Sequence, residues 1–292
     1  MKKFQMFTNL QKISHIFRKK LFVILSLISV ILGLFSFPIG AQTEQEAYLY
    51  ATPWYETNGN RVRIAINQPS LSETRNGIIE VVLKPKWKTY WRNPGNSGMA
   101  PFFTFDQPVS YEIFYPTPQL YEIEDNWSFS YTDKVVLPFT VSGSSKNLSG
   151  SLTIGICDTI CIPFIVDFNF SPSSQKNEHI PSSLLTHAQA ALPRTMHNEF
   201  KISAEKDFNT LFIKIQNNRK ITHLSIFLDG GDMQIGPAKR LNDHEEYTFF
   251  TAPIYFDPDE PNQTVFYTVS SKSHALSGTF TISTQSPSTP LP

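Results

Sequence analysis

Residues 152–170 of this 292-residue chain read LTIGICDTICIPFIVDFNF and contain both of its cysteines. The apolar and β-branched residues on either side of the cysteines are typical of β-strands. Along a straight strand, residues four positions apart are separated by about 13 Å, whereas a disulfide requires Cα atoms about 4.4–6.8 Å apart. The stretch therefore predicts a β-hairpin with residues 158–160 as its loop, in which Cys157 and Cys161 face each other.

The spacing of the two cysteines leaves three interpretations open. A disulfide between Cys157 and Cys161 would close a very small loop, which stabilises a fold least and is more readily reduced and reoxidised. This favours a catalytic pair that carries thiol–disulfide exchange. The alternatives are an inert disulfide in a binding or assembly module, and an envelope copper-handling protein in which both thiolates are Cu(I) ligands. No tight cluster of Met or His stands beside the pair, which weakens the copper interpretation.

The rest of the chain repeats the pattern of short strands. A content of 24 Phe, 11 Tyr, 4 Trp and 21 Pro, with 17% charged residues, favours strands and turns over helices. The pattern predicts an all-β fold, a β-sandwich followed by a second, smaller β-sandwich. The runs expected to form strands are 62–66, 77–83, 134–141, 152–156 and 162–170 in the first sandwich, and 211–215, 224–228, 264–269 and 278–282 in the second.

Changes in composition predict the domain boundaries. Residues 42–170 are assigned to the first domain and residues 194–285 to the second. The polar stretch that starts at Ser171 begins a linker over residues 171–193, and residues 286–292 are expected to be a disordered tail. Within the linker, one short helix is expected over 182–191, with Ser182 or Ser183 as its cap and Pro193 just past its end.

The first 41 residues have the order of a secretory signal peptide. Six basic residues and no acidic one are followed by an apolar run over 21–37 and by small residues that end at Ala41. Cleavage after Ala41 is expected, and the alternative is a retained amino-terminal anchor. In both cases the remaining chain is exported, and we expect a periplasmic protein without stable membrane insertion after cleavage.

Export changes the net charge of the chain. The whole sequence balances 25 basic against 25 acidic residues, and removal of the six basic residues of the signal leaves 19 against 25, a net charge of about −6. A negative net charge argues against binding to nucleic acid or to an anionic membrane surface.

A second distinctive stretch, residues 87–98, reads WKTYWRNPGNSG. Trp87, Tyr90 and Trp91 are three large aromatic residues within five positions, and a Pro-Gly turn follows them. They can be core residues at the end of a strand, or an aromatic wall that shields the sulfurs. Arg92 could hold a carboxylate within the sandwich or stabilise a thiolate.

The chain resembles the amino-terminal periplasmic domain of DsbD-type protein-disulfide reductases, in particular the ScsB-like branch. The resemblance covers roughly residues 47–170, and a weaker one extends over 190–284. The matching pieces, in family order, are Leu83 with residues 87–98, then 115–118 (YPTP), then Tyr131 with 135–138 (VVLP), and finally 157–163 (CDTICIP).

This resemblance implies an immunoglobulin-like fold for the first sandwich and a redox role for Cys157 and Cys161. It also implies that a membrane-embedded electron-donor protein and periplasmic thioredoxin-fold proteins are the partners. The aromatic residues and Arg92, together with Tyr131, are then candidates for shielding the pair or contacting a partner. No cofactor is predicted, and no metal site other than the alternative use of the two cysteines. If the pair is active, the chemistry is that of a protein-disulfide reductase.

Overall fold

The computed structural model describes residues 47–68, 73–143, 147–171, 177–195, 201–216, 223–243, 246–260, 262–272 and 274–282. The predicted signal peptide and the predicted tail lie outside these ranges. The chain divides into two compact units, Met1–Gln45 and Glu46–Pro292, and all that follows concerns the second. None of the helices within the described ranges is long and apolar enough to cross a membrane.

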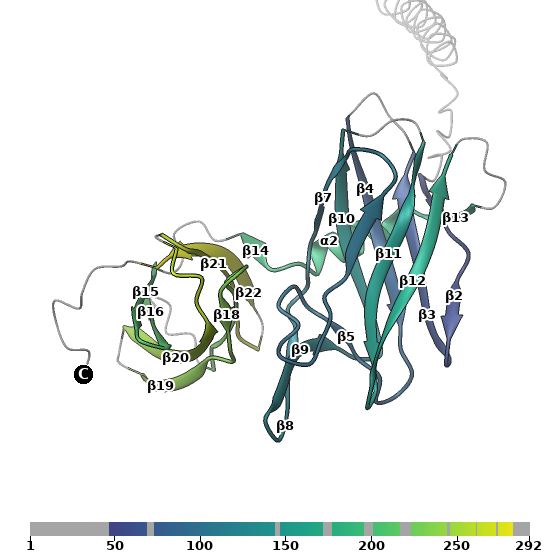
Figure 1. Cartoon of the computed structure of the whole chain (residues 1–292). Helices are drawn as coiled ribbons and strands as arrows, with labels where there is room; N and C mark the ends of the chain where they lie inside the picture. Colours follow the sequence, from purple (N-terminus) through teal and green to yellow (C-terminus); the bar gives the residue numbers. More distant parts are fainter. Residues whose placement is uncertain are drawn as a thin grey trace, which may run out of the picture. The chain divides into compact units, whose positions relative to one another are not determined.

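The first sandwich is built on a seven-stranded antiparallel sheet (Figure 1). Its strands are β1 (Tyr48–Ala51), β2 (Tyr55–Thr57), β3 (Asn60–Asn67), β4 (Thr74–Val82), β7 (Ser110–Ile113), β10 (Lys134–Ser142) and β13 (Glu178–Pro181). Their order is β13-β1-β3-β4-β10-β7, with β2 paired to β3. The alternating β-branched residues of β3, β4 and β10 are typical of strands that bury one face, and these strands lie at the centre of the sheet.

Two smaller sheets complete the first sandwich. Their strands are β5 (Thr89–Tyr90), β6 (Phe102–Phe105), β8 (Gln119–Ile123), β9 (Asn126–Tyr131), β11 (Leu148–Cys157) and β12 (Cys161–Phe170). The orders are β12-β11-β6 and β5-β9-β8. Ile64, Ile79 and Leu137 of the large sheet share one buried core with Leu152 and Ile154 of β11. The predicted immunoglobulin-like sandwich is confirmed, as is the hairpin that carries the cysteines.

Part of the predicted linker packs on the first sandwich. β13 pairs with β1, and helix α2 (Ser183–Ala190) follows it directly. Ala188 of the helix is buried in a small cluster with Leu49 and Ile78. Ser182 stands at the N-cap position, as expected, although its side chain makes no capping hydrogen bond.

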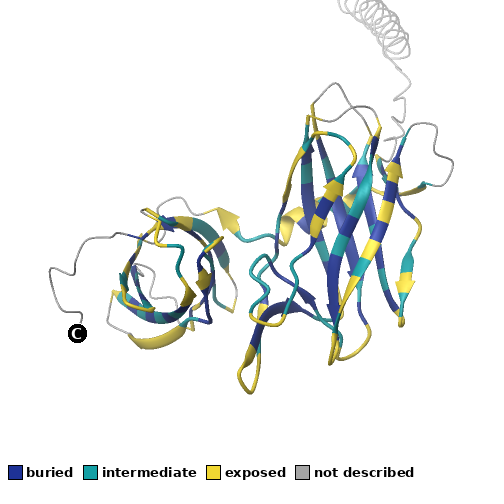
Figure 2. Cartoon of the chain, in the orientation of Figure 1, coloured by how far each residue is buried: buried dark blue, intermediate teal, exposed yellow. Residues whose placement is uncertain are grey.

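The second sandwich has a core of its own. Its strands are β14 (Arg194–Thr195), β15 (Lys201–Asp207), β16 (Thr210–Gln216), β17 (Ser225–Asp229), β18 (Gln234–Ile235), β19 (Lys239–Asp243), β20 (Tyr247–Phe256), β21 (Thr264–Ser270) and β22 (Ala275–Thr281). One sheet has the order β14-β22-β21-β17, and the other has the order β15-β16-β20-β18 with β19 on β20. Along β16 and most of β20, buried residues alternate with partly exposed ones, which is the pattern expected of strands that bury one face. Figure 2 shows a similar alternation of buried and exposed residues along the second half of β12 in the first sandwich.

Candidate functional site

The two cysteines lie at the end of the longest hairpin of the first sandwich. β11 and β12 pair antiparallel over ten residue pairs, and the last pair is Cys157 with Cys161. A disulfide joins them, with their Cα atoms 4.2 Å apart. The three loop residues 158–160 are exposed, as the spacing of the cysteines predicted.

The two sulfurs differ in accessibility. Cys157 is 3% exposed, whereas Cys161 is partly exposed. Cys157 is also held by its backbone, because its N–H donates to the Lys88 carbonyl and its carbonyl accepts the Lys88 N–H, at 2.9 and 2.7 Å. The Thr89 hydroxyl donates to the Gly155 carbonyl at 2.9 Å. The predicted aromatic stretch therefore begins as a strand bonded to the cysteine hairpin.

Two groups from residues 90–98 touch the more accessible sulfur. The Tyr90 hydroxyl lies 3.0 Å from Cys161 Sγ, and the Ser97 carbonyl oxygen lies 3.1 Å from the same atom. A disulfide sulfur carries no hydrogen, so Tyr90 must be the donor of the first contact and the Ser97 carbonyl receives no hydrogen bond. After reduction, a Cys161 thiol could donate to Ser97, and a Cys161 thiolate could accept from Tyr90.

The ring of Tyr90 is held by close backbone contacts on both sides. A Cβ atom at Gly98 would lie 2.3 Å from the ring, and one at Gly155 would lie 3.2 Å from it. Gly98 is therefore required for the ring to lie where it does, and a side chain at Gly155 would press on the ring from a second direction. Burial raises the pKa of the Tyr90 hydroxyl to about 12, so the hydroxyl keeps its proton at neutral pH.

A pocket of about 610 Å³ opens beside the disulfide. Both cysteines and Tyr90 line it, and the hairpin of β8 and β9 supplies much of the opposite wall. Lys86, Lys88 and Asp158 are the charged residues among those that line it. The lining residues that lie outside the stretches singled out by sequence analysis are Lys86, Tyr121, Ile123, Asn126, Trp127, Ser128 and Thr132.

The other residues predicted to shield the pair do not line this pocket. Trp91 is buried and packs edge-on against Phe129 and against Phe227 of the second sandwich. The Arg92 guanidinium lies over the rings of Trp91, Tyr115 and Phe266, 5.3–5.7 Å from their centroids. The two remaining candidates serve the first sandwich itself: Trp87 packs against its core, and the Tyr131 hydroxyl donates to the Pro116 carbonyl at 2.7 Å.

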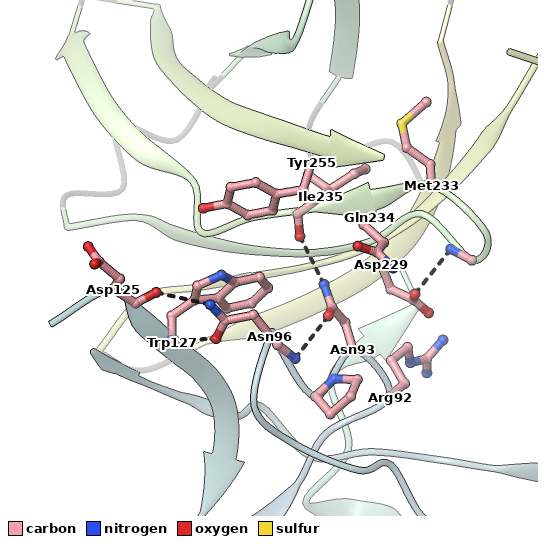
Figure 3. Close-up of a pocket in the computed structure, with 13 residues that line it drawn as sticks. Arg92, Asn93, Asn96, Asp125, Trp127, Asp229, Met233, Gln234, Ile235 and Tyr255 are labelled. Atoms are coloured by element: carbon pink, nitrogen blue, oxygen red, sulfur yellow. Dashed lines mark hydrogen bonds between the residues drawn. The ribbon is translucent and has the colours of Figure 1, made fainter. Parts of the chain in front are cut away.

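A second pocket, of about 650 Å³, lies where residues 92–96 meet the second sandwich (Figure 3). Trp127 stacks on Tyr255 at its edge, with centroids 6.3 Å apart. The Trp127 indole nitrogen and Arg92 Nε are buried there without a hydrogen-bond partner among the described residues. Trp127 lines both this pocket and the sulfur pocket, so the two pockets share a wall residue.

Clusters of metal-ligating side chains are absent among the described residues. No group of three or more His, Cys, Asp or Glu residues there could hold a metal ion.

The fold and the disulfide together define a class, an immunoglobulin-like domain with a cysteine pair at the end of a hairpin. Within this class, residues 62–171 match the family model of the amino-terminal domain of the thiol:disulfide interchange protein DsbD. The resemblance drawn from the sequence is thereby confirmed for the first sandwich.

Comparison with solved structures extends the likeness of the fold. The crystal structure of the N-terminal periplasmic domain of ScsB from Proteus mirabilis matches with a TM-score of 0.69 and 23% sequence identity. The match covers 80% of this chain and 98% of that one, so it extends well beyond the residues that the family model matches. A search of curated proteins found no match.

Proposed function

We propose that this protein carries out thiol–disulfide exchange through Cys157 and Cys161. The observation that carries the proposal is the disulfide at the end of the β11–β12 hairpin, which borders a pocket and joins a buried cysteine, Cys157, to a partly exposed one, Cys161. The match of residues 62–171 to the DsbD amino-terminal family supports the same chemistry.

As a purely structural bond, this disulfide would add little to the stability of the fold. Chain-entropy arguments assign about 2 kcal/mol to a loop of five residues and about 4.7 kcal/mol to one of 100 residues. Ten residue pairs already join β11 to β12, and the bond links no distant strands. A bond placed mainly to stabilise a sandwich would link distant segments.

The exchange proceeds in two steps that balance. In the reduced protein, the Cys161 thiolate attacks one sulfur of a partner disulfide, and the other partner sulfur leaves as a thiolate and takes up a proton. The Cys157 thiolate then attacks Cys161 Sγ, the protein disulfide forms, and the second partner sulfur leaves and is protonated. Two electrons pass to the partner, and the two protons that it gains match those lost by Cys157 and Cys161.

Accessibility is the reason to assign the first attack to Cys161. Exchange requires the attacking sulfur to reach the partner sulfur directly, and Cys157 is 3% exposed and held in the sheet by Lys88. Cys157 is then the resolving cysteine, and it needs only to reach the sulfur directly opposite it across the hairpin.

The compartment and the partners belong to the same proposal. The matching solved structure is described as a periplasmic domain, and an oxidising compartment is where exposed disulfides persist. We place the mature protein in the periplasm, with a membrane-embedded protein as electron donor and thioredoxin-fold proteins as recipients. The pocket beside Cys161 would face the incoming partner sulfur.

The test is the reduction potential of the Cys157–Cys161 pair, measured by equilibrating the mature protein with glutathione or dithiothreitol buffers. A value of roughly −120 to −270 mV is expected, the range of exchange proteins. A value below about −300 mV would indicate an inert structural disulfide and overturn the proposal. The matched variants C157S and C161S identify the attacking sulfur. C157S, which keeps Cys161, should form a mixed disulfide with oxidised glutathione at least about ten times faster than C161S, which keeps only the buried Cys157.

A further inference from the structure

Residues 90–98 connect the cysteine pair to the second sandwich. Tyr90 and Ser97, near the two ends of this segment, touch Cys161 Sγ. The residues between them contact β17 and β18 of the second sandwich. One short segment of the first sandwich therefore has the disulfide on one side and the second sandwich on the other.

Asn93 makes the polar part of the contact with the second sandwich. Its side-chain amide donates to the Leu228 carbonyl at 2.8 Å and to the Ile235 carbonyl at 3.1 Å, and Figure 3 shows the latter bond. Its Oδ1 accepts the Gly95 N–H at 3.2 Å. Both amide hydrogens and the oxygen are thus used, and the residue fixes the turn of its own segment as well as the contact.

The neighbouring side chain makes the apolar part of the contact. Phe227 of β17 lies edge-on to Trp91, with ring centroids 6.3 Å apart, and edge-on to Phe129, 5.3 Å apart. Trp91 is 1% exposed. It directly follows Tyr90 in the chain, so a shift of the second sandwich would be transmitted to the ring that contacts Cys161.

The two contacts on Cys161 have opposite effects on its protonation. A hydrogen bond from Tyr90 stabilises a thiolate, whereas a carbonyl oxygen at Ser97 stabilises a protonated thiol. The charged residues that line the pocket beside the sulfur are Lys86, Lys88 and Asp158. The reactivity of Cys161 therefore depends on how firmly residues 90–98 are held.

We propose that Asn93 is a positioning residue, through which the second sandwich fixes the Tyr90 hydroxyl and the Ser97 carbonyl against Cys161. This rests on the proposed exchange function and adds to it a role for the second sandwich. The physical reason is that a group in contact with a reactive atom is oriented by its own hydrogen-bond partners, as is known for the ligands of metal ions. Here Asn93 holds the segment that carries Tyr90 and Ser97.

The test uses N93D in the mature full-length chain. Aspartate keeps the shape of asparagine and can still accept the Gly95 N–H, but it loses both donors to the second sandwich. The readout is the pH midpoint of alkylation of Cys161 by iodoacetamide in a C157S background, with and without Y90F. N93A, which adds no charge, serves as a second variant.

In the chain with Asn93, Y90F should shift the midpoint upward by about one pH unit. In N93D and in N93A, the shift caused by Y90F should fall to less than about half of that value, because Tyr90 is no longer held against the sulfur. D257N, which removes the ion pair with Lys206 elsewhere in the second sandwich, should leave the Y90F shift unchanged.

An equal Y90F shift in the presence and absence of Asn93 would overturn the inference, as would the absence of any shift. A smaller shift in D257N as well would also overturn it, because general loosening of the second sandwich would then be the cause. None of these outcomes changes the reduction potential of the unmodified pair, which tests the exchange function separately.

Discussion

Tyr90 is a buried residue of the first sandwich whose hydroxyl contacts the disulfide. Its hydroxyl donates toward Cys161 Sγ, and its ring is held between the backbone of Gly98 and that of Gly155. Burial raises its pKa to about 12, so it remains a donor over the whole range in which thiols titrate. A donor of this kind favours the thiolate, the form of cysteine that attacks disulfides.

Removing this one hydroxyl should make Cys161 a weaker acid. In the C157S background, Y90F should raise the pH midpoint of Cys161 alkylation by about one unit, because a hydrogen bond to a charged group contributes about 1.5–3 kcal/mol. The rate of iodoacetamide alkylation as a function of pH measures it. Y131F is the matched control. The Tyr131 hydroxyl donates to the Pro116 carbonyl, and Tyr131 does not line the sulfur pocket. A midpoint that is unchanged or lower in Y90F would contradict the prediction.

At the scale of single residues, the sequence predicted the paired cysteines better than their surroundings. The four-residue spacing of the cysteines predicts both the hairpin and the facing sulfurs, because strand geometry permits no other bonded arrangement. Tyr90 could be chosen as a candidate from its aromatic neighbourhood. The Ser97 carbonyl could not, because every residue has a carbonyl and only the fold determines which one lies near a sulfur.

At the scale of elements, a buried carboxylate joins three strands of the large sheet. Glu80 of β4 accepts from Arg63 of β3 at 2.7 Å and from Lys134 of β10 at 2.8 Å. Burial by itself would raise the pKa of Glu80, but the hydrogen bonds from Lys134 and Arg63 outweigh it and lower the pKa below its ordinary value. The charged form is therefore the one that stabilises the sheet.

E80Q should destabilise the protein at neutral pH by about 3 kcal/mol, because one partner of a buried ion pair is lost. Since the pKa of Glu80 is lower in the folded state than in the unfolded state, its contribution is complete above the unfolded value of about 4.3 and is lost as pH falls through the folded value. The difference in unfolding free energy between the native sequence and E80Q should therefore shrink on going from about pH 5 to about pH 3. Urea unfolding at several pH values measures it.

E178Q provides the control for this prediction. Glu178 also faces Arg63, but at 3.9 Å and with its side chain 53% exposed. Exposed pairs contribute about 0–1 kcal/mol, so E178Q should change the unfolding free energy little at any pH. A loss of stability in E178Q equal to that in E80Q would show that burial of Glu80 is not the cause.

Strands were predicted well where neighbouring residues alternate in polarity or are β-branched, and poorly where they do not show such a pattern. The runs 134–141 and 162–170 alternate or are β-branched, and they form β10 and β12. The hairpin of β8 and β9, which forms a wall of the sulfur pocket, was not predicted. Its residues are mixed in polarity along β8, where most are exposed. The position of this hairpin depends on β9, which pairs with β5 and buries five of its six residues, rather than on a buried face of β8.

For the whole molecule, the sequence predicted two sandwiches but not the contact between them. The strands of the second sandwich are visible as apolar runs, since β16, β17 and β21 each bury alternate residues or more, and β22 buries Leu276 and Phe280. The contact itself relies on one asparagine and on aromatic residues that the sequence alone assigns equally well to a core. Which aromatic residue faces which sandwich is decided by pairing between distant segments, which a local pattern does not encode.

The last prediction concerns the coupling of the two sandwiches. Phe227 belongs to the second sandwich but packs on Trp91 and Phe129 of the first, and it is 8% exposed. F227A should destabilise the protein by about 3 kcal/mol, the cost of truncating a buried phenylalanine. Part of this loss should appear in the first sandwich, because Trp91 loses a neighbour there.

Tryptophan fluorescence separates this effect from a loss confined to the second sandwich. All four tryptophans, at positions 54, 87, 91 and 127, belong to the first sandwich, so their thermal transition reports on that sandwich. F227A should lower the midpoint of this transition by several degrees. F280A, which truncates a core residue stacked on Tyr267 inside the second sandwich, should lower it much less. If F227A left the fluorescence midpoint at the native value, the two sandwiches would be independent in stability. The contact of Phe227 with Trp91 would then not couple the second sandwich to the segment that touches Cys161.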